Sequence, residues 1–125
     1  MDAVTAAAVA EAIEALTGRL AGKLTTQHVM RAVGDSDEQR ARRHLDTATA
    51  TVGAYLGTAS TVAAVPQAVL EQATLSAATS LHHTEQAPHG VANFGDLDAT
   101  PVRVGRDPLT AARPLLRPFV GVGIA

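Results

Sequence analysis

The chain has 125 residues, a net charge of −2 at pH 7 and no cysteine, so one domain is expected, and a disulfide framework, a thiolate zinc site and an iron–sulfur cluster are excluded. Charged residues make up 18% of the chain, which disfavours a highly charged disordered tail and a strongly basic nucleic-acid-binding protein. Hydrophobic residues make up 46%, but 26 residues are alanine and only three are aromatic, so we expect a thin core that partner surfaces help to complete.

Residues 1–34 are expected to form two N-terminal helices. The first spans about Ala3–Leu16, where apolar residues recur at helical spacing, and Gly18 is its expected stop. The second is shorter, follows Thr25 and ends at Gly34. The apolar runs are too short to span a bilayer, and the N-terminus lacks the basic region of a secretory signal. We therefore expect a cytoplasmic chain that does not contact a membrane.

Residues 35–86 are expected to form a pair of core helices. Ser36 and Gln39 have the spacing of a capping box, which predicts the start of a helix rich in arginine in its first two turns. A small, polar linker over 58–64 follows this helix. Pro66 then suits the first position of the second core helix, because proline is common there. Apolar residues at spacings of three and four predict that this helix continues to the end of the segment.

The last 39 residues divide into a loop and a C-terminal segment. Residues 87–106 are rich in glycine, proline, asparagine and aspartate, which predicts a long extended loop with room for a short hairpin. Asp107 and Pro108 predict an N-cap and the first turn of a short helix, and an apolar tail ends the segment 107–125. The expected fold class is all-α: a single domain over 1–125, built as a small bundle of four or five helices.

Side chains that could carry chemistry are few and poorly spaced. The strongest metal-like group is His82, His83, Glu85 and His89, but no two of these histidines are four residues apart on a helix. No serine lies in a Gly-x-Ser-x-Gly elbow. We therefore expect no metal site, no cofactor and no enzymatic activity.

A basic group lies at the start of the first core helix. Arg40, Arg42 and Arg43 could contact phosphates if this helix faces nucleic acid, but no aromatic residues are interleaved with them to stack on bases. The alternative is a solvated helix face whose arginines pair with the acidic residues over 35–38. A small helical DNA-associated or regulatory module is thus one hypothesis, and a structural dimerisation domain is another.

The order of these segments resembles a known family. An acidic cap and a helix with a terminal Tyr (SDEQRARRHLDTATATVGAYLG), a small-residue linker and a proline-started helix (VPQAVLEQATLSAATSLHH) follow one another. This order is similar to that of the head-tail connector, or adaptor, proteins of long-tailed bacteriophages. The ending RDPLTAARPLLRPFVGVGIA is similar to the ending of actinobacteriophage members. The resemblance covers roughly residues 35–125 and consists of helix boundaries, not of catalytic motifs.

The resemblance implies a structural virion protein, assembled in the host cytoplasm. Such a protein forms a homo-oligomeric ring, typically dodecameric, beneath the portal protein in the neck between capsid and tail. It receives the stopper or tail-terminator protein below, and the ring forms part of the channel through which genomic double-stranded DNA passes, with transient, sequence-independent contact. Acidic residues of the middle of the chain are candidates to line this channel, among them Asp96 and Asp98.

The resemblance also directs attention to the C-terminal segment as a portal-facing or subunit-facing anchor. Its apolar residues are the expected contacts, and its arginines are the expected charged rim. The alternative is that the segment closes the subunit's own core. The candidate interface residues are Leu109, Arg113, Leu115, Leu116, Arg117, Phe119, Val120 and Ile124.

Overall fold

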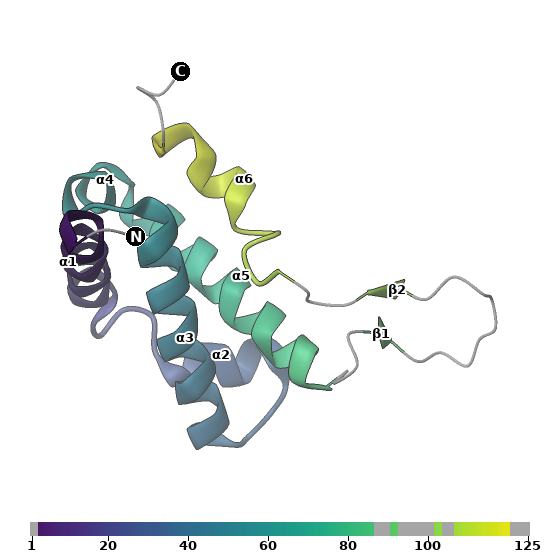
Figure 1. The fold of residues 1–125 in the computed structure, drawn as a ribbon. Coiled ribbons are helices and arrows are strands. Elements are labelled where there is room, and N and C mark those ends of the chain that lie inside the picture. The colour runs from purple at the N-terminus through teal and green to yellow at the C-terminus, as the bar shows by residue number, and fades with distance from the viewer. Residues whose placement is uncertain (1–2, 87–90, 93–101, 104–106, 121–125) are drawn as a thin grey trace.

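The computed structural model describes residues 3–86, 91–92, 102–103 and 107–120, and these form an all-α bundle as expected (Figure 1). Two strands of two residues each, β1 (Val91–Ala92) and β2 (Val102–Arg103), pair antiparallel beside the bundle, with Val91 opposite Arg103. In chain order, the helices of the described residues are α1 (Ala3–Leu20), α2 (Thr26–Val33), α3 (Glu38–Leu56), α4 (Ala59–Ala64), α5 (Gln67–Gln86), α6 (Arg113–Leu116) and the 3₁₀-helix η1 (Arg117–Phe119).

Helix α2 ends at Gly34 as expected, and α3 also ends at a glycine. Gly34 and Gly57 follow these helices with φ angles of 70° and 84°, a left-handed conformation that costs glycine little because it has no Cβ. The start of α3 differs from the predicted Ser36–Gln39 capping box. Asp37 is the N-cap, and its carboxylate accepts a hydrogen bond from the Arg40 backbone N–H at 3.1 Å.

Two boundaries in the first half of the chain were predicted wrongly. Gly18 does not stop α1, which continues to Leu20, because the burial of Leu16 and Leu20 against the bundle outweighs the roughly 1 kcal/mol that glycine costs inside a helix. The predicted linker over 58–64 contains α4. The Thr58 hydroxyl accepts a hydrogen bond from the Thr61 backbone N–H at 3.1 Å, and Val62 is fully buried, so local capping and burial together stabilise this short helix.

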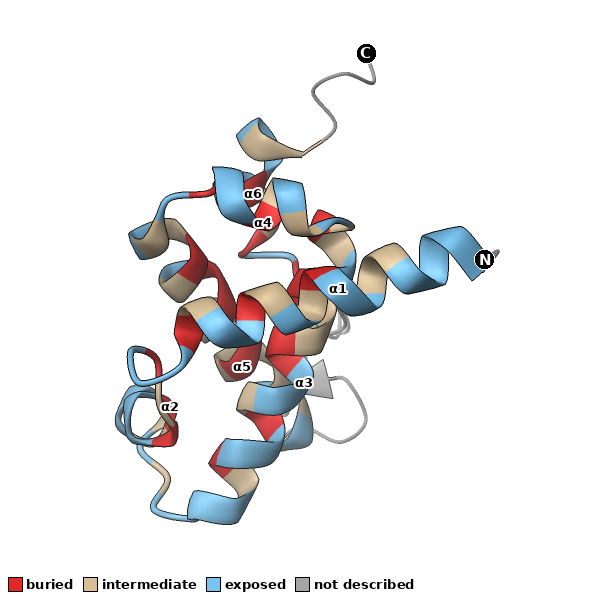
Figure 2. Cartoon of the chain, turned by 90° about the vertical axis from the view of Figure 1, so that its left-hand side faces the viewer, coloured by how far each residue is buried: buried red, intermediate tan, exposed pale blue. Residues whose placement is uncertain are grey.

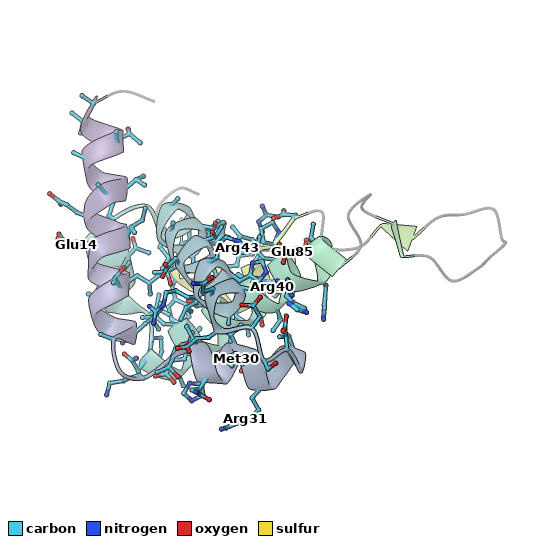
Figure 3. All side chains as sticks on the ribbon, turned by 90° about the horizontal axis from the view of Figure 1, so that it is seen from below. Glu14, Met30, Arg31, Arg40, Arg43 and Glu85 are labelled. Atoms are coloured by element: carbon cyan, nitrogen blue, oxygen red, sulfur yellow. The ribbon has the colours of Figure 1, made fainter. Side chains whose placement is uncertain are left out.

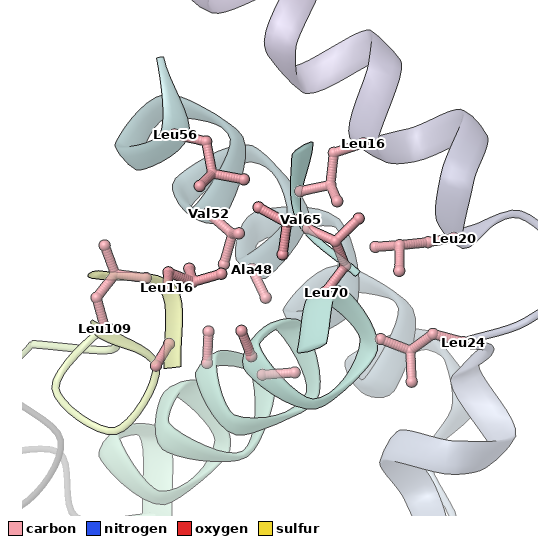
Figure 4. Close-up of a cluster of buried hydrophobic side chains, with 14 of the residues drawn as sticks. Leu16, Leu20, Leu24, Ala48, Val52, Leu56, Val65, Leu70, Leu109 and Leu116 are labelled. Carbon is pink, nitrogen blue, oxygen red and sulfur yellow. The ribbon is translucent and has the colours of Figure 1, made fainter. Parts of the chain in front are cut away.

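The buried hydrophobic residues form one cluster at the centre of the bundle (Figure 4). Helices α3 and α5 pack against each other, α1 lies across α3 and α4, and α2 closes the end nearest the start of α3. Most of the buried side chains are small, and Ala48 of α3 and Ala73 and Ala77 of α5 are fully buried. Small residues at these positions let the helices approach closely, which compensates in part for the shortage of bulky side chains.

The C-terminal segment is less helical than expected. It forms turns over 107–112, and only Arg113–Leu116 are α-helical before η1 begins. Asp107 still caps the segment, since its carboxylate accepts a hydrogen bond from the Leu109 backbone N–H at 2.9 Å. The prolines explain the shortened helix, because Pro114 and Pro118 each lack the N–H that would continue an α-helical ladder.

Candidate interaction surfaces

The C-terminal segment contains an internal ion pair and contacts α3 through an aromatic ring. A carboxylate oxygen of Asp107 lies 2.6 Å from Nη1 of Arg113, and the Arg113 guanidinium lies 6.0 Å from the centre of the Tyr55 ring on α3. The hydrogen bond from the Leu109 backbone and the contact with Arg113 lower the pKa of Asp107 below its usual range. Arg113, predicted as part of a partner-facing rim, is therefore half-buried and bound within its own chain.

The predicted apolar contacts of this segment divide into two faces. Leu109 and Leu116 are buried in the chain's own core (Figure 4), and Ala112 is buried with them. The expectation that these two leucines contact a partner is therefore wrong: the turns over 107–112 and the first turn of α6 direct them into the core of their own chain. Leu115, Phe119 and Val120 are half-buried at the edge of the core, and Arg117 is exposed. Only this second group is accessible to another molecule.

Three of the predicted site residues lie outside the described residues. They are Ile124 in the apolar tail and the loop residues Asp96 and Asp98. The structure consequently provides no test of the predicted channel-lining acids or of the last apolar contact.

A cluster of charged side chains joins the start of α3 to the end of α5 (Figure 3). Glu85 of α5 lies 3.2 Å from Arg40 Nε and 2.6 Å from Arg43 Nη2, and its carboxylate also lies 3.1 Å from Nε2 of the buried His44. Partial burial acts to raise the pKa of Glu85, but the hydrogen bond from His44 and the positive charges of Arg43 and Arg40 lower it overall. These contacts link residues more than 40 positions apart.

The same cluster contains a second buried histidine. His82 is only 6% exposed, and its ring centre lies 5.9 Å from that of His44 in an edge-to-face arrangement. Burial lowers the pKa of His82, and the nearby Asp35, whose carboxylate is 3.8 Å from Nδ1, offsets this only in part. The pKa of Asp35 is itself lowered by hydrogen bonds from the Asp37 backbone and from the Arg40 guanidinium at 2.9 Å.

The residues considered as metal ligands do not converge in the described part of the chain. His83 is exposed, His82 faces His44 and Asp35, and Glu85 binds arginines. Across residues 3–86, 91–92, 102–103 and 107–120, no group of three or more His, Cys, Asp or Glu side chains could hold a metal ion. His89 lies outside these ranges.

The three arginines of α3 do not form one basic surface. Arg40 pairs with Asp35 at 2.9 Å as well as with Glu85, and Arg43 also pairs with Glu85. The predicted pairing with residues 35–38 is correct for Asp35 and for Asp37, which lies 3.7 Å from Arg40 Nη2, and is incomplete, because Glu85 was not foreseen as a partner. Arg42 has no ion pair among the described residues and lines a groove between α1 and α3.

This groove has a volume of about 390 Å³ and was not predicted from the sequence. Its wall on α1 and the turn after it is mainly apolar, and its wall on α3 is mixed. The lining residues are Ile13, Thr17, Leu20, Ala21, Leu24, Arg42, Leu45, Asp46 and Thr49. The only signal in the sequence was the apolar repeat of the first helix, which predicts an amphipathic face without showing that α3 leaves part of that face uncovered.

The first half of α1 is the second unpredicted feature. Helix α1 extends beyond the rest of the bundle towards its N-terminus (Figure 2), and Ala12 is its first fully buried residue. Val4 is 78% exposed and is the one large hydrophobic residue that is exposed in the described part of the chain. Among the described residues, no helix is long and apolar enough to cross a membrane.

No known family model, curated protein or solved structure with which the chain was compared matches it. The likeness to phage connectors consequently depends on the order of the segments and their caps within this chain. The surfaces described above, namely the accessible face of the C-terminal segment, the charged α3–α5 cluster and the α1–α3 groove, are the observations from which a function can be argued.

Proposed function

We propose that the chain is a structural virion protein, a head-to-tail adaptor subunit without catalytic activity. In this proposal, copies of the chain form a ring beneath the portal protein in the neck of a phage particle, after synthesis in the host cytoplasm. The ring joins the capsid to the tail, receives a stopper or tail-terminator protein and forms part of the channel for double-stranded DNA.

The observation that supports this function best is the two-faced C-terminal segment. Its inner face, Leu109 and Leu116, is buried, and an ion pair between Asp107 and Arg113 fixes its start. A segment anchored in this way presents its other face without needing to fold upon binding, which lowers the entropic cost of association.

The accessible face has the composition of a protein–protein contact. Leu115, Phe119 and Val120 are half-buried, and Arg117 is exposed beside them. Aromatic residues and arginine are enriched at the energetically important positions of interfaces. The five residues after Val120, Gly-Val-Gly-Ile-Ala, carry no charged side chain, and apolar residues of this kind suit contact with a partner.

The small size of the core also favours a subunit of an assembly. Seven of the 18 buried hydrophobic residues in the described part of the chain are alanines, and none of the 18 is aromatic. Each buried alanine removes little apolar surface from water, so the free energy of folding from one chain is modest and contacts with neighbouring subunits would add to it.

The test is the mass of the purified chain, alone and after mixing with the portal protein encoded beside it, measured by light scattering with negative-stain imaging. We expect a ring, formed either by the chain alone or on the portal. A compact dimer that does not bind the portal protein would contradict the proposal and favour a structural dimerisation domain.

The DNA-associated alternative is less well supported by the geometry. Arg40 and Arg43 are neutralised by Asp35 and Glu85 and are therefore poorly placed to release counterions from DNA. Titration of the chain with duplex DNA at several salt concentrations separates the two functions. An affinity that falls steeply with salt would favour the DNA-associated module, since phosphate contacts by Arg42 and its neighbours must show this dependence.

A further inference from the structure

We propose that the first half of α1, residues 3–11, docks into the α1–α3 groove of a second copy of the chain. We call residues 3–11 the arm. The inference rests on the proposed ring function and specifies which two surfaces form the contact between subunits. The occupant of the groove is thus a segment of this same protein.

Most of the arm is exposed. Ala3, Val4, Ala6 and Ala7 are exposed and Val9 is half-buried, whereas the second half of α1 buries Ala12, Leu16 and Leu20. An isolated helix of this length is marginal in water, and most helical stability in proteins comes from packing of an apolar face. The arm extends beyond the bundle (Figure 2), so a second molecule that covers its apolar face would stabilise it as a helix.

The groove suits a helix of small side chains. Its floor is formed by partly covered apolar residues, including Ile13 and Leu45, and it is open to solvent along its length between α1 and α3. Packed helices lie about 8–10 Å apart depending on the side chains at the contact, and small side chains allow the shorter distances. The arm, with alanines around a single exposed valine, has such side chains.

Charge restricts how the arm can enter the groove. The arm has one charged residue, Glu11, which is exposed and has no ion pair among the described residues. The groove is lined by Arg42 and Asp46, and Lys23 lies exposed beside its end at Leu24; Arg42 and Lys23 have no ion pair in the described ranges. An arm whose Glu11 meets Arg42 or Lys23 and avoids Asp46 has one favoured orientation, because complementary charges fix the register of a contact.

The arm and the groove are different patches of the same chain, so the contact is head-to-tail. Each subunit donates its arm to one neighbour and accepts the arm of another. Such heterologous contacts close into rings when the rotation between subunits permits, whereas a two-fold dimer uses one patch on both partners. The inference therefore predicts a closed ring or an open filament and excludes a two-fold dimer.

Disulfide trapping tests the contact, and the natural chain has no cysteine to interfere. Ala7→Cys marks the exposed face of the arm, and Ala21→Cys marks the exposed rim of the groove. After mixing and mild oxidation, alone and with the portal, we expect a disulfide-linked pair only where both variants are present. A chain that carries both substitutions should give a ladder of linked oligomers.

The control for trapping is Gln72→Cys, because Gln72 is exposed on α5 away from both surfaces. Linking of Ala7→Cys to Gln72→Cys as efficiently as to Ala21→Cys would overturn the inference. So would efficient linking of Ala7→Cys to itself, because that pattern indicates a two-fold contact between arms.

A second measurement does not need cysteine. Val4→Glu places a charge in the docked arm and should weaken assembly by roughly tenfold or more, whereas Gln72→Glu should leave it unchanged. An assembly unaffected by Val4→Glu, with no arm–groove link, overturns the inference and leaves the adaptor function standing. Arm–groove links in a chain that ignores the portal support the inference and contradict the adaptor function, and a natural chain that stays monomeric with and without the portal contradicts both.

Discussion

At Gly53 the lack of a side chain determines how closely two helices can pack. A Cβ at this position would lie 2.8 Å from Ile13 Cγ1 and 2.9 Å from Ile13 Cα. Since one of these atoms belongs to the backbone of α1, a rotamer change cannot relieve the contact. We expect Gly53→Ala to lower the free energy of unfolding by about 1–3 kcal/mol, the usual cost of overpacking, as measured by urea denaturation.

Gly18 is the matched control for this substitution. It also lies inside a helix, but a Cβ there would meet nothing within 4 Å. Gly18→Ala should therefore stabilise the protein by about 0.5–1 kcal/mol, because alanine loses less conformational entropy on forming a helix. If both substitutions changed stability by the same amount and sign, the close approach of α1 and α3 at Gly53 would be wrong.

The buried His82 makes stability depend on pH. Its pKa is lowered from 6.5 by burial, and by the positive charge of Arg40 and the neighbouring His44 and His83, against the opposing effect of Asp35. The unfolded chain therefore binds a proton at a higher pH than the folded chain does. The stabilisation is complete above pH 6.5 and is lost as the pH falls through the lower folded pKa of His82.

Three carboxylates add a second acid-dependent loss. The pKa values of Asp35, Glu85 and Asp107 are lowered from 3.8, 4.5 and 3.8, so their stabilising contribution is present above these values and is lost as the pH falls through the folded pKa of each group. Urea denaturation at intervals from pH 7.5 to 3 should show stability falling in two stages. His82→Gln should remove the first stage and keep the second, and a variant that kept both would disprove the role of His82.

At the scale of elements, one arginine connects three helices. Arg19 of α1 donates hydrogen bonds from Nη1 to the carbonyl oxygens of Val62 and Val65, each at 2.7 Å, and from Nε to the side chain of Gln67 at 3.2 Å. The two carbonyl oxygens lie at the end of α4, where a helix leaves most such groups without an α-helical partner, and the Val62 oxygen also accepts a hydrogen bond from the Val65 backbone N–H at 3.2 Å. Gln67 in turn donates to the Arg19 carbonyl oxygen at 2.7 Å.

Replacing Arg19 should therefore loosen the junction of α4 and α5. We expect Arg19→Met to lower the free energy of unfolding by about 1.5–3 kcal/mol, since the hydrogen bonds involve a charged donor and the carbonyl oxygens lose their partner. Arg19→Lys should cost less but still be destabilising, because one ammonium group cannot reproduce the planar guanidinium geometry. Hydrogen exchange should show the loss concentrated in α4. Uniform loss of protection over the whole bundle would contradict this local role.

The C-terminal segment should respond differently at its two faces. Leu116→Ala creates a cavity in the core and should lower the free energy of unfolding by about 2–5 kcal/mol. Arg117→Glu changes an exposed residue and should alter stability by no more than about 0.5 kcal/mol. In the proposed function, Arg117→Glu instead weakens binding to the portal protein. Denaturation and portal binding measured on both variants separate folding from docking.

For the whole molecule, the thin core makes assembly and stability interdependent. If neighbouring subunits cover the arm and the groove, the folded state is favoured by association, and the thermal midpoint rises with protein concentration. Scanning calorimetry over a hundredfold concentration range should show this rise for the natural chain and not for Val4→Glu. A midpoint independent of concentration in a chain that light scattering shows to be oligomeric would mean that the subunits fold fully before they meet.

Local sequence was enough to predict the all-α class, the two core helices and the glycine that follows α2. These features follow from local chemistry: periodic apolar residues, caps and left-handed glycines act over a few positions. The same local reasoning failed at Gly18 and at α4, where burial of Leu20 and Val62 against distant helices outweighed weak local preferences.

Which residues of each segment face the core depends on contacts between segments that are distant in the sequence. Leu109 and Leu116 were expected to meet a partner and instead complete the core, and Glu85 binds Arg40 and Arg43 across more than 40 positions of sequence. The α1–α3 groove and the exposed first half of α1 likewise depend on how much of α1 is covered by its neighbouring helices. Spacing along a chain specifies a face of each helix, whereas the packing angle and overlap between helices depend on the summed fit of many small contacts.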